Sequence, residues 1–159
     1  MPIKVFISHQ QADSARATYV SSRLLTQHQI DTYLDVIDPT IAKSGEALVD
    51  YVHRKLGECT QLLAVVSAAT KSSWWVPWEI GVATEKDFPL ATYGGDTPLP
   101  EYLHKWPVLK TDAHLDAYAQ ASKTASKFYE SKRMIVEAAA AQRSATQEFY
   151  RVLRGQIGQ

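Results

Sequence analysis

The residues with the clearest capacity for chemistry lie between Ser67 and Gly81, in the segment SAATKSSWWVPWEIG. This segment follows an apolar run, residues 62–66, that has the composition of a buried strand. It places three tryptophans and one carboxylate, Glu79, at the expected start of a helix. A carboxylate among so many aromatic rings costs free energy unless it is solvated, paired or used. Glu79 is therefore the first candidate for a catalytic residue.

A second group of polar residues follows the first apolar run of the chain, residues 3–7. Ser8, His9 and Gln10 come directly after this run, as Ser67 does after the later one. Polar loop residues after a strand are mostly only solvated, although such positions also carry binding residues. His9 has no evident carboxylate partner in the sequence, so a Ser-His-Asp triad is not supported. All four residues remain candidates for contacts with a substrate.

The elements that must position these residues alternate between strands and helices. The expected strands are residues 3–7, 30–34, 61–66, 88–93 and 108–110, and the expected helices are residues 12–28, 46–57, a Trp-rich helix ending near 86, 112–125 and 128–153. Asp112 is the expected cap of the fourth helix, and the stretch 97–107 with its three prolines is expected to be irregular.

This alternation predicts an α/β fold with a parallel sheet of about five strands, helices on both faces and a C-terminal helix. Right-handed crossovers and short loops favour a flavodoxin-like strand order, 2-1-3-4-5. The chain leaves strands one and three in opposite directions, which opens a crevice at their carboxyl ends. Residues 8–10 and 67–79 both fall there, where this architecture binds ligands.

The composition excludes several classes of function. Seventeen basic and seventeen acidic residues balance, so we expect binding neither to nucleic acid nor to a membrane. Cys59 is the only cysteine, which excludes an internal disulfide and predicts a small core residue. No apolar run reaches membrane-spanning length, and the N-terminal run is too short for a signal peptide. We expect a soluble cytoplasmic protein.

Cofactor and metal signatures are missing from the sequence. No Gly-rich fingerprint follows the first expected strand, so a Rossmann-type redox use of NAD is not indicated. There is no Walker loop either, and the five histidines lack metal-ligand spacing. We expect no metal and no cofactor.

Three sequence blocks together resemble a Toll/interleukin-1 receptor (TIR) domain. Residues 5–9 (VFISH) are similar to the opening Phe-Ile-Ser box of that family, and residues 33–45 resemble its strand B and BB loop. Residues 73–79 (SWWVPWE) are similar to the Ser-x-Trp-x-x-x-Glu pattern of the enzymatic branch. The resemblance spans residues 3–125, and we therefore divide the chain into a TIR domain (1–127) and a C-terminal helical extension packed on it (128–159).

Enzymatic TIR domains cleave the nicotinamide–ribose bond of NAD and release ADP-ribose or a cyclic isomer of it. Short bacterial members resemble the sensor subunits of antiphage systems such as Thoeris, whose cyclic product activates a separate effector. The resemblance implies NAD as the substrate, a homo-oligomer on activation, and Glu79 as the catalytic residue. It also implies substrate contacts from Ser73 and Trp75, and a loop from Asp38 to Gly45 lying over the site. The loop lacks the Arg-Asp-x-x-Pro-Gly pattern of receptor adaptors, which disfavours receptor-type signalling.

A single carboxylate suits NAD cleavage because the leaving pyridinium departs as neutral nicotinamide and needs no proton, whereas ordinary glycosidases use two carboxyl groups. Trp75 lies one helical turn before Glu79 if the helix is continuous, although Pro77 leaves open a helix that begins there. Trp74 and Trp78 are expected in the core. Two alternatives stay open: a non-catalytic TIR scaffold that acts by assembly, and a nucleoside or nucleotide N-glycosidase of related fold.

Overall fold

The computed structural model describes residues 2–34, 45–94 and 98–159. Its elements, in chain order, are β1 (Lys4–Ser8), η1 (Gln11–Asp13), α1 (Ser14–His28), β2 (Asp31–Leu34), α2 (Gly45–Gly57), β3 (Gln61–Val65), η2 (Ala68–Ser72), α3 (Trp75–Glu85), β4 (Leu90–Tyr93), η3 (Glu101–Lys105), β5 (Val108–Leu109), α4 (Asp112–Arg133) and α5 (Ala138–Ile157), where η marks a short 3₁₀ helix.

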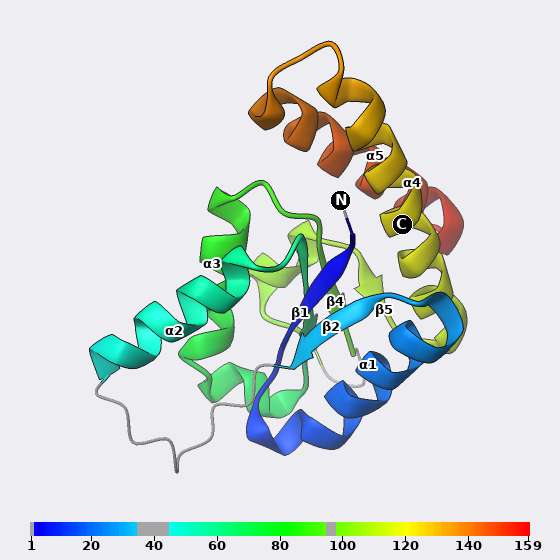
Figure 1. Ribbon diagram of the computed structural model, residues 1–159. Helices are drawn as coiled ribbons and strands as arrows, with labels where there is room; N and C mark the ends of the chain where they lie inside the picture. The colour runs from blue at the N-terminus through cyan, green and yellow to red at the C-terminus, as the bar shows by residue number, and fades with distance from the viewer. Residues whose placement is uncertain (1, 35–44, 95–97) are drawn as a thin grey trace.

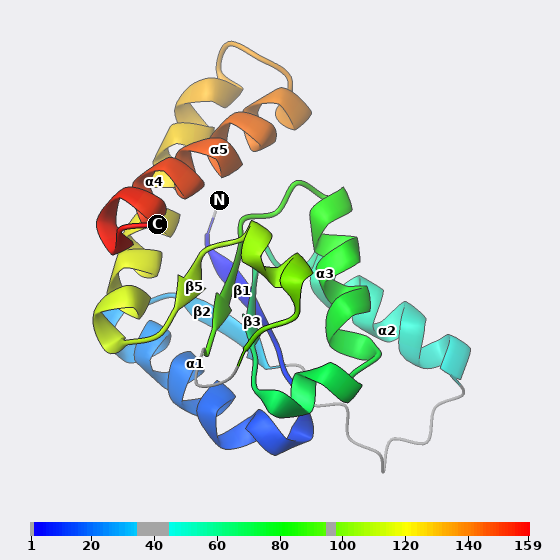
Figure 2. The ribbon, with the colours of Figure 1, turned by 180° about the vertical axis from the view of Figure 1, so that it is seen from behind.

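The strands form one parallel sheet in the order β2-β1-β3-β4-β5 (Figure 1). The predicted α/β, flavodoxin-like fold is therefore confirmed. In the register between the two central strands, Ser8 at the end of β1 lies opposite Ala64 of β3. Because all strands are parallel, their carboxyl ends meet at one edge, where η1 and η2 also lie side by side (Figures 1 and 2).

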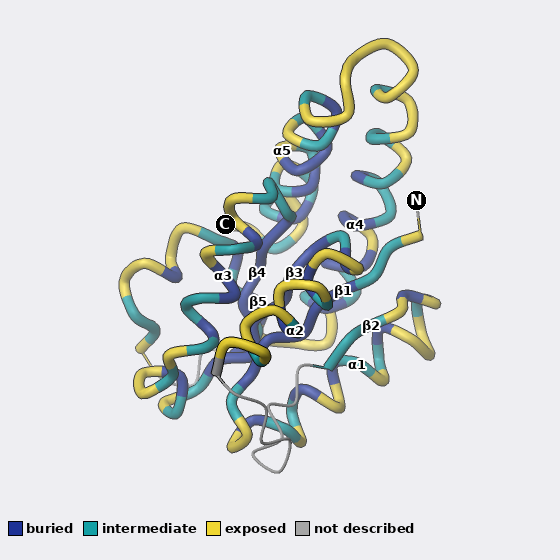
Figure 3. The backbone as a smooth tube through the Cα atoms, turned by 60° about the vertical axis from the view of Figure 1, so that its left-hand side comes forward, coloured by how far each residue is buried: buried dark blue, intermediate teal, exposed yellow. Residues whose placement is uncertain are grey.

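Each face of the sheet buries its own apolar cluster, because successive side chains of a strand point to opposite faces. Val5 and Ile7 join the cluster under α1, α4 and α5, whereas Phe6 joins the cluster under α2 and α3. The central strands β1 and β3 are consequently buried on both sides (Figure 3), as expected for a parallel sheet, whereas the edge strand β2 is half-buried. Each large aliphatic side chain so buried contributes roughly 1.5–3 kcal/mol.

Cys59 lies in the cluster under α2 and α3, where it is a core residue as expected from the sequence. Burial raises the pKa of its thiol to about 11, which keeps the sulfur protonated and unreactive near neutral pH.

The last two helices form a hairpin that extends beyond the amino edge of the sheet (Figures 1 and 2). The base of α5 is tied to the sheet because the backbone N–H of Leu90 donates to the Tyr150 hydroxyl at 3.0 Å. Thr146 adds a hydrogen bond from its hydroxyl to the carbonyl of Asp87 at 2.6 Å. α4 and α5 also share the apolar cluster that covers α1.

The hairpin differs from the sequence prediction in its boundaries. We predicted helices over 112–125 and 128–153, but α4 continues to Arg133 and α5 starts at Ala138. No glycine or proline interrupts residues 112–133, so the helix has no reason to stop at 125. It ends instead before Ile135 and Val136, whose β-branched side chains have a lower helix propensity. α4 therefore crosses residue 127, and the division of the chain at that point stays a prediction.

The cap of α4 is also a correction. The Thr111 side chain accepts a hydrogen bond from the backbone N–H of His114 at 3.2 Å, so Thr111 and not Asp112 caps the helix. Asp112 instead accepts a hydrogen bond from the Tyr19 hydroxyl at 2.7 Å and forms an ion pair with Arg23. The stretch expected to be irregular contains η3.

Candidate functional site

The candidate site lies at the carboxyl edge of β1 and β3. Ser8 ends β1, and its side chain points to the same face as Phe6 because the two are separated by one residue. α3 covers this face and buries Val76 and Ile80 against it. A polar side chain of α3 that faces the sheet near the end of β1 can therefore contact the Ser8 hydroxyl.

Glu79 is that inward-facing residue. Its side chain has 0% exposure, and the Ser8 hydroxyl donates a hydrogen bond to its Oε2 atom. A buried polar group costs free energy unless it is hydrogen-bonded, so the bond from Ser8 offsets part of the cost of burying the Glu79 carboxyl group. The structure thus turns Glu79 inward, toward the carboxyl end of β1, and not toward solvent.

The start of α3 determines how Trp75 lies relative to Glu79. The helix begins at Trp75, and the Ser73 hydroxyl accepts a hydrogen bond from the backbone N–H of Val76 at 3.1 Å. Pro77 sits in the first turn, where a missing N–H costs nothing. Trp75 and Glu79 consequently belong to one continuous helix, one turn apart and on the same side. Ser73 itself serves as a cap for this helix.

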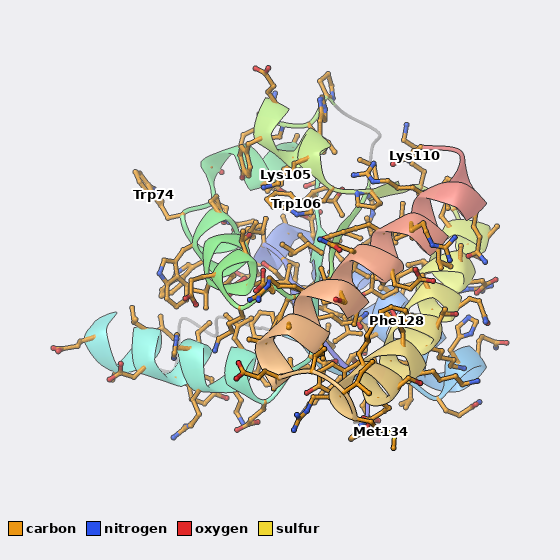
Figure 4. All side chains as sticks on the ribbon, turned by 90° about the horizontal axis from the view of Figure 1, so that it is seen from above. Trp74, Lys105, Trp106, Lys110, Phe128 and Met134 are labelled. Carbon is orange, nitrogen blue, oxygen red and sulfur yellow. The ribbon has the colours of Figure 1, made fainter. Side chains whose placement is uncertain are left out.

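The three tryptophans occupy different environments. The ring of Trp75 lies edge-to-face on that of Trp78, with 5.4 Å between centroids and an interplanar angle of 84°. Trp78 packs against the core, as predicted. Trp74 contradicts the prediction, since its side chain is 90% exposed and points away from the fold (Figure 4). Trp74 precedes the helix and faces neither core cluster, which periodicity alone could not show.

Asp13 is a second buried carboxylate that sequence reasoning missed. It ends η1 with 7% exposure, and the Ser67 hydroxyl donates a hydrogen bond to its Oδ2 atom at 2.8 Å. The same Ser67 oxygen accepts a hydrogen bond from the backbone N–H of Ala69 at 3.2 Å, which caps η2. Asp13 therefore joins the loop after β1 to the loop after β3. In the sequence it is only an acidic residue near a helix start, so no signal separated it from an ordinary exposed aspartate.

The remaining predicted residues are placed as follows. His9 is 6% exposed, and its Nδ1 atom lies 3.2 Å from the carbonyl oxygen of Ile7. Gln10 is half-buried, and its backbone carbonyl accepts a hydrogen bond from the N–H of Asp13 at 2.8 Å. Gly45 is the first residue of α2, whereas Asp38 lies outside the described residues.

Gly94 sets how closely β4 approaches the candidate site. Its φ of 147° lies in the region that side chains rarely adopt, and a β-carbon there would overlap the backbone oxygen of Val66. Val66 immediately precedes Ser67, so the close approach supports the loop that carries Ser67. Within the described stretches, no group of three or more His, Cys, Asp or Glu side chains is arranged to hold a metal ion.

Comparison with known proteins gives the family. The sequence profile of the TIR domain matches residues 5–126, which is most of the chain. The chain therefore belongs to the TIR domain family. It is similar to the TIR domains in the structure of the activated Roq1 resistosome directly recognizing the pathogen effector XopQ, with 15% sequence identity, 98% of both chains covered and a TM-score of 0.46. No curated protein gives a significant match.

Proposed function

We propose that the chain cleaves the nicotinamide–ribose bond of NAD, with Glu79 as the catalytic carboxylate and Trp75 as a stacking surface for the nicotinamide ring. The observation that carries the proposal is the position of Glu79. It is an inward-facing carboxylate, hydrogen-bonded by Ser8, at the sheet edge where parallel α/β folds bind ligands. Membership of the TIR family supports the proposal, because that family includes NADases as well as scaffolds.

The chemistry requires one well-placed negative charge. When the bond between C1′ and the pyridinium nitrogen breaks, its electron pair stays on the nitrogen, and nicotinamide leaves as a neutral molecule. The ribose carbon becomes an oxocarbenium-like cation, which Glu79 stabilises while Ser8 holds the carboxylate in place. Such a preorganised charge is typically worth about 3–4 kcal/mol of barrier. Water then attacks C1′ and loses a proton to solvent to give ADP-ribose, or a nucleophilic atom of the same molecule forms the new bond to C1′ and gives a cyclic isomer.

The complete burial of Glu79 has a consequence for this function. NAD reaches the carboxylate only after side chains at this edge move apart, because the residue has 0% exposure. We propose that self-assembly provides the change, so that a homo-oligomer is the active form. The resemblance to the bacterial enzymatic branch supports a cytoplasmic role in antiphage signalling, in which a separate effector responds to the product.

Two observations favour other functions. Asp13 places a second buried carboxylate at the same edge, which suits an N-glycosidase that protonates the leaving base of a nucleoside or nucleotide. The lack of any exposed surface on Glu79 suits a non-catalytic scaffold in which the carboxylate only stabilises the fold.

One experiment separates these three functions. The purified chain is incubated with NAD, nucleosides and nucleotides, with and without a crowding agent that promotes assembly, and the products are identified by mass spectrometry. NAD cleavage gives nicotinamide together with ADP-ribose or a cyclic isomer, whereas an N-glycosidase releases bases from the other substrates. A scaffold releases nothing in any condition.

Two variants test whether Glu79 is the catalytic residue for nicotinamide release. Glu79→Gln keeps an acceptor for Ser8 but removes the charge, and it should lower the rate of nicotinamide release by a few hundredfold while the fold remains intact. Glu85→Gln is the matched control, because Glu85 ends the same helix and is exposed. Equal release by the wild-type chain and Glu79→Gln would reject the proposed catalytic role.

A further inference from the structure

The tip of the α4–α5 hairpin exposes apolar side chains to solvent. Met134, Ile135 and Val136 form the turn between the two helices, and they are 86%, 75% and 38% exposed. Figure 3 shows this turn as an exposed loop at the far end of the hairpin, and Figure 4 shows Met134 projecting outward from the helices. Consecutive exposed apolar residues are unfavourable in water, and in soluble proteins they mark surfaces that contact a partner.

Basic side chains outnumber acidic ones along the two helices that lead into this turn. The net charge of the whole chain is zero, yet the stretch 123–143 holds five basic side chains and two acidic ones, Glu130 and Glu137. The basic residues are Lys123, Lys127, Lys132, Arg133 and Arg143. Two of them end α4 directly before Met134, and the Lys132 ammonium lies 5.5 Å from the centre of the Phe128 ring. The hairpin therefore combines an excess of positive charge, spread along its two helices, with an apolar tip.

We propose that this tip docks on an anionic phospholipid bilayer, with Met134 and Ile135 inserted among the acyl chains and the basic residues against the headgroups. A few inserted apolar side chains together with neighbouring lysines and arginines are what peripheral binding to anionic lipid needs. Peripheral binding is the mode that fits, because no helix in the described part of the chain is long and apolar enough to cross a membrane.

Other occupants fit the tip less well. A stable protein–protein interface buries about 800 Å² on each partner, which a convex turn of three residues cannot supply. Nucleic acid binding depends on contacts with phosphate groups, and the apolar side chains of Met134 and Ile135 cannot make such contacts.

The hairpin tip and the candidate functional site lie at opposite edges of the sheet, so docking through the tip does not cover the site. The hairpin extends past the amino edge of the sheet, whereas Ser8 lies at the carboxyl edge (Figure 1). A chain held by the tip on a bilayer thus turns its candidate site away from the lipid and toward soluble molecules.

Vesicle sedimentation with the full chain tests the proposal. Vesicles of phosphatidylcholine alone are compared with vesicles that also contain phosphatidylserine, at low and at high salt. The wild-type chain should pellet with the anionic vesicles at low salt, stay in solution with the neutral ones, and be released by salt. The double variant Met134→Ser/Ile135→Ser should lower the partition coefficient by about tenfold or more, because it removes the apolar insertion. Lys127→Gln/Arg133→Gln should lower it by about tenfold, because it removes the attraction to headgroups.

Leu25→Ser and Lys110→Gln are the matched controls. Leu25 is 51% exposed on α1, and Lys110 is an exposed basic residue outside the hairpin, so neither change should affect sedimentation. The proposal is overturned if the wild-type chain binds neither vesicle, binds both equally, or binds as well with the two tip residues changed. It is also overturned if the chain ignores vesicles but binds a single-stranded RNA through the same basic residues.

Discussion

The two edges of the sheet differ in opposite ways from the usual pattern of apolar residues inside and polar residues outside. At the carboxyl edge, polar side chains are buried and hydrogen-bonded to one another, as Ser8 is to Glu79 and Ser67 is to Asp13. At the amino edge, the hairpin tip exposes apolar side chains such as Met134 to solvent. Buried polar residues and exposed apolar residues occur mainly at functional sites, where they lower stability but allow binding or chemistry. The comparison is consistent with the two surfaces that we propose, one for chemistry at the carboxyl edge and one for docking at the hairpin tip.

The largest expected effect on stability comes from Gly94, which supports the carboxyl edge. Gly94→Ala combines a disfavoured φ with an overlap on the Val66 backbone oxygen, and it should destabilise the fold by about 3 kcal/mol or more. Urea unfolding measures this change. Gly155→Ala is the control, because Gly155 lies in α5 with open space around it and should gain about 0.5–1 kcal/mol. Equal effects from both changes would contradict the close approach at Gly94.

The second effect tests the buried polar pair directly. Ser8→Ala removes the hydrogen bond to Glu79 and should cost about 2–3 kcal/mol of stability, because the carboxylate stays buried. Ser72→Ala is the comparison, since its exposed hydroxyl donates to the carbonyl of Ala69, and the variant should lose no more than about 0.5 kcal/mol of stability. If Ser8→Ala unfolds at the same urea concentration as the wild-type chain, the hydrogen bond from Ser8 to Glu79 does not stabilise the carboxyl edge as we describe.

The fold was predictable to a greater extent than the site, for a physical reason. Strand order and element positions follow from local patterns of apolar residues, and the order 2-1-3-4-5 is confirmed. Glu79 stood out because a carboxylate among tryptophans is locally unusual. Asp13 did not stand out, because its burial depends on Ser67, which is distant in the chain. Trp74 was placed wrongly for the same reason, since exposure is decided by tertiary packing.

The docking proposal departs from a sequence prediction that stays untested. The balanced net charge predicted no membrane partner, whereas a total charge does not show how the charges are distributed along the chain. The tip becomes evident only when α4 is known to end at Arg133 and the following three residues to be exposed. Composition therefore excludes functions only when the charges are evenly spread.

The third effect concerns the amino edge and is expected to be close to zero. Met134→Ser/Ile135→Ser should leave the unfolding free energy within about 0.5 kcal/mol of the wild-type value, because both side chains are exposed. Thermal and urea unfolding measure it. A large loss of stability would mean that the tip packs within the fold and would remove the contrast between the two edges.

A comparably small effect is expected at an ion pair that belongs to neither edge. Arg23 and His28 of α1 hydrogen-bond to Asp116 of α4 and hold the pKa of its carboxyl below the ordinary value of 3.8. A lowered pKa contributes stability above the unfolded value, and this contribution is lost as the pH falls through the folded value. Asp116→Asn should therefore lower Tm by about 2 °C or less near neutral pH, since the group is solvated. The difference should vanish in acid, and a difference that grows with falling pH would contradict the assignment.

The central claim concerns Glu79, and the rate of nicotinamide release from NAD tests it most directly. We predict measurable release by the assembled wild-type chain and a loss of a few hundredfold in Glu79→Gln, matching about 3–4 kcal/mol of charge stabilisation. Glu85→Gln should match the wild-type rate. Release that is undiminished in a folded Glu79→Gln variant would contradict the account.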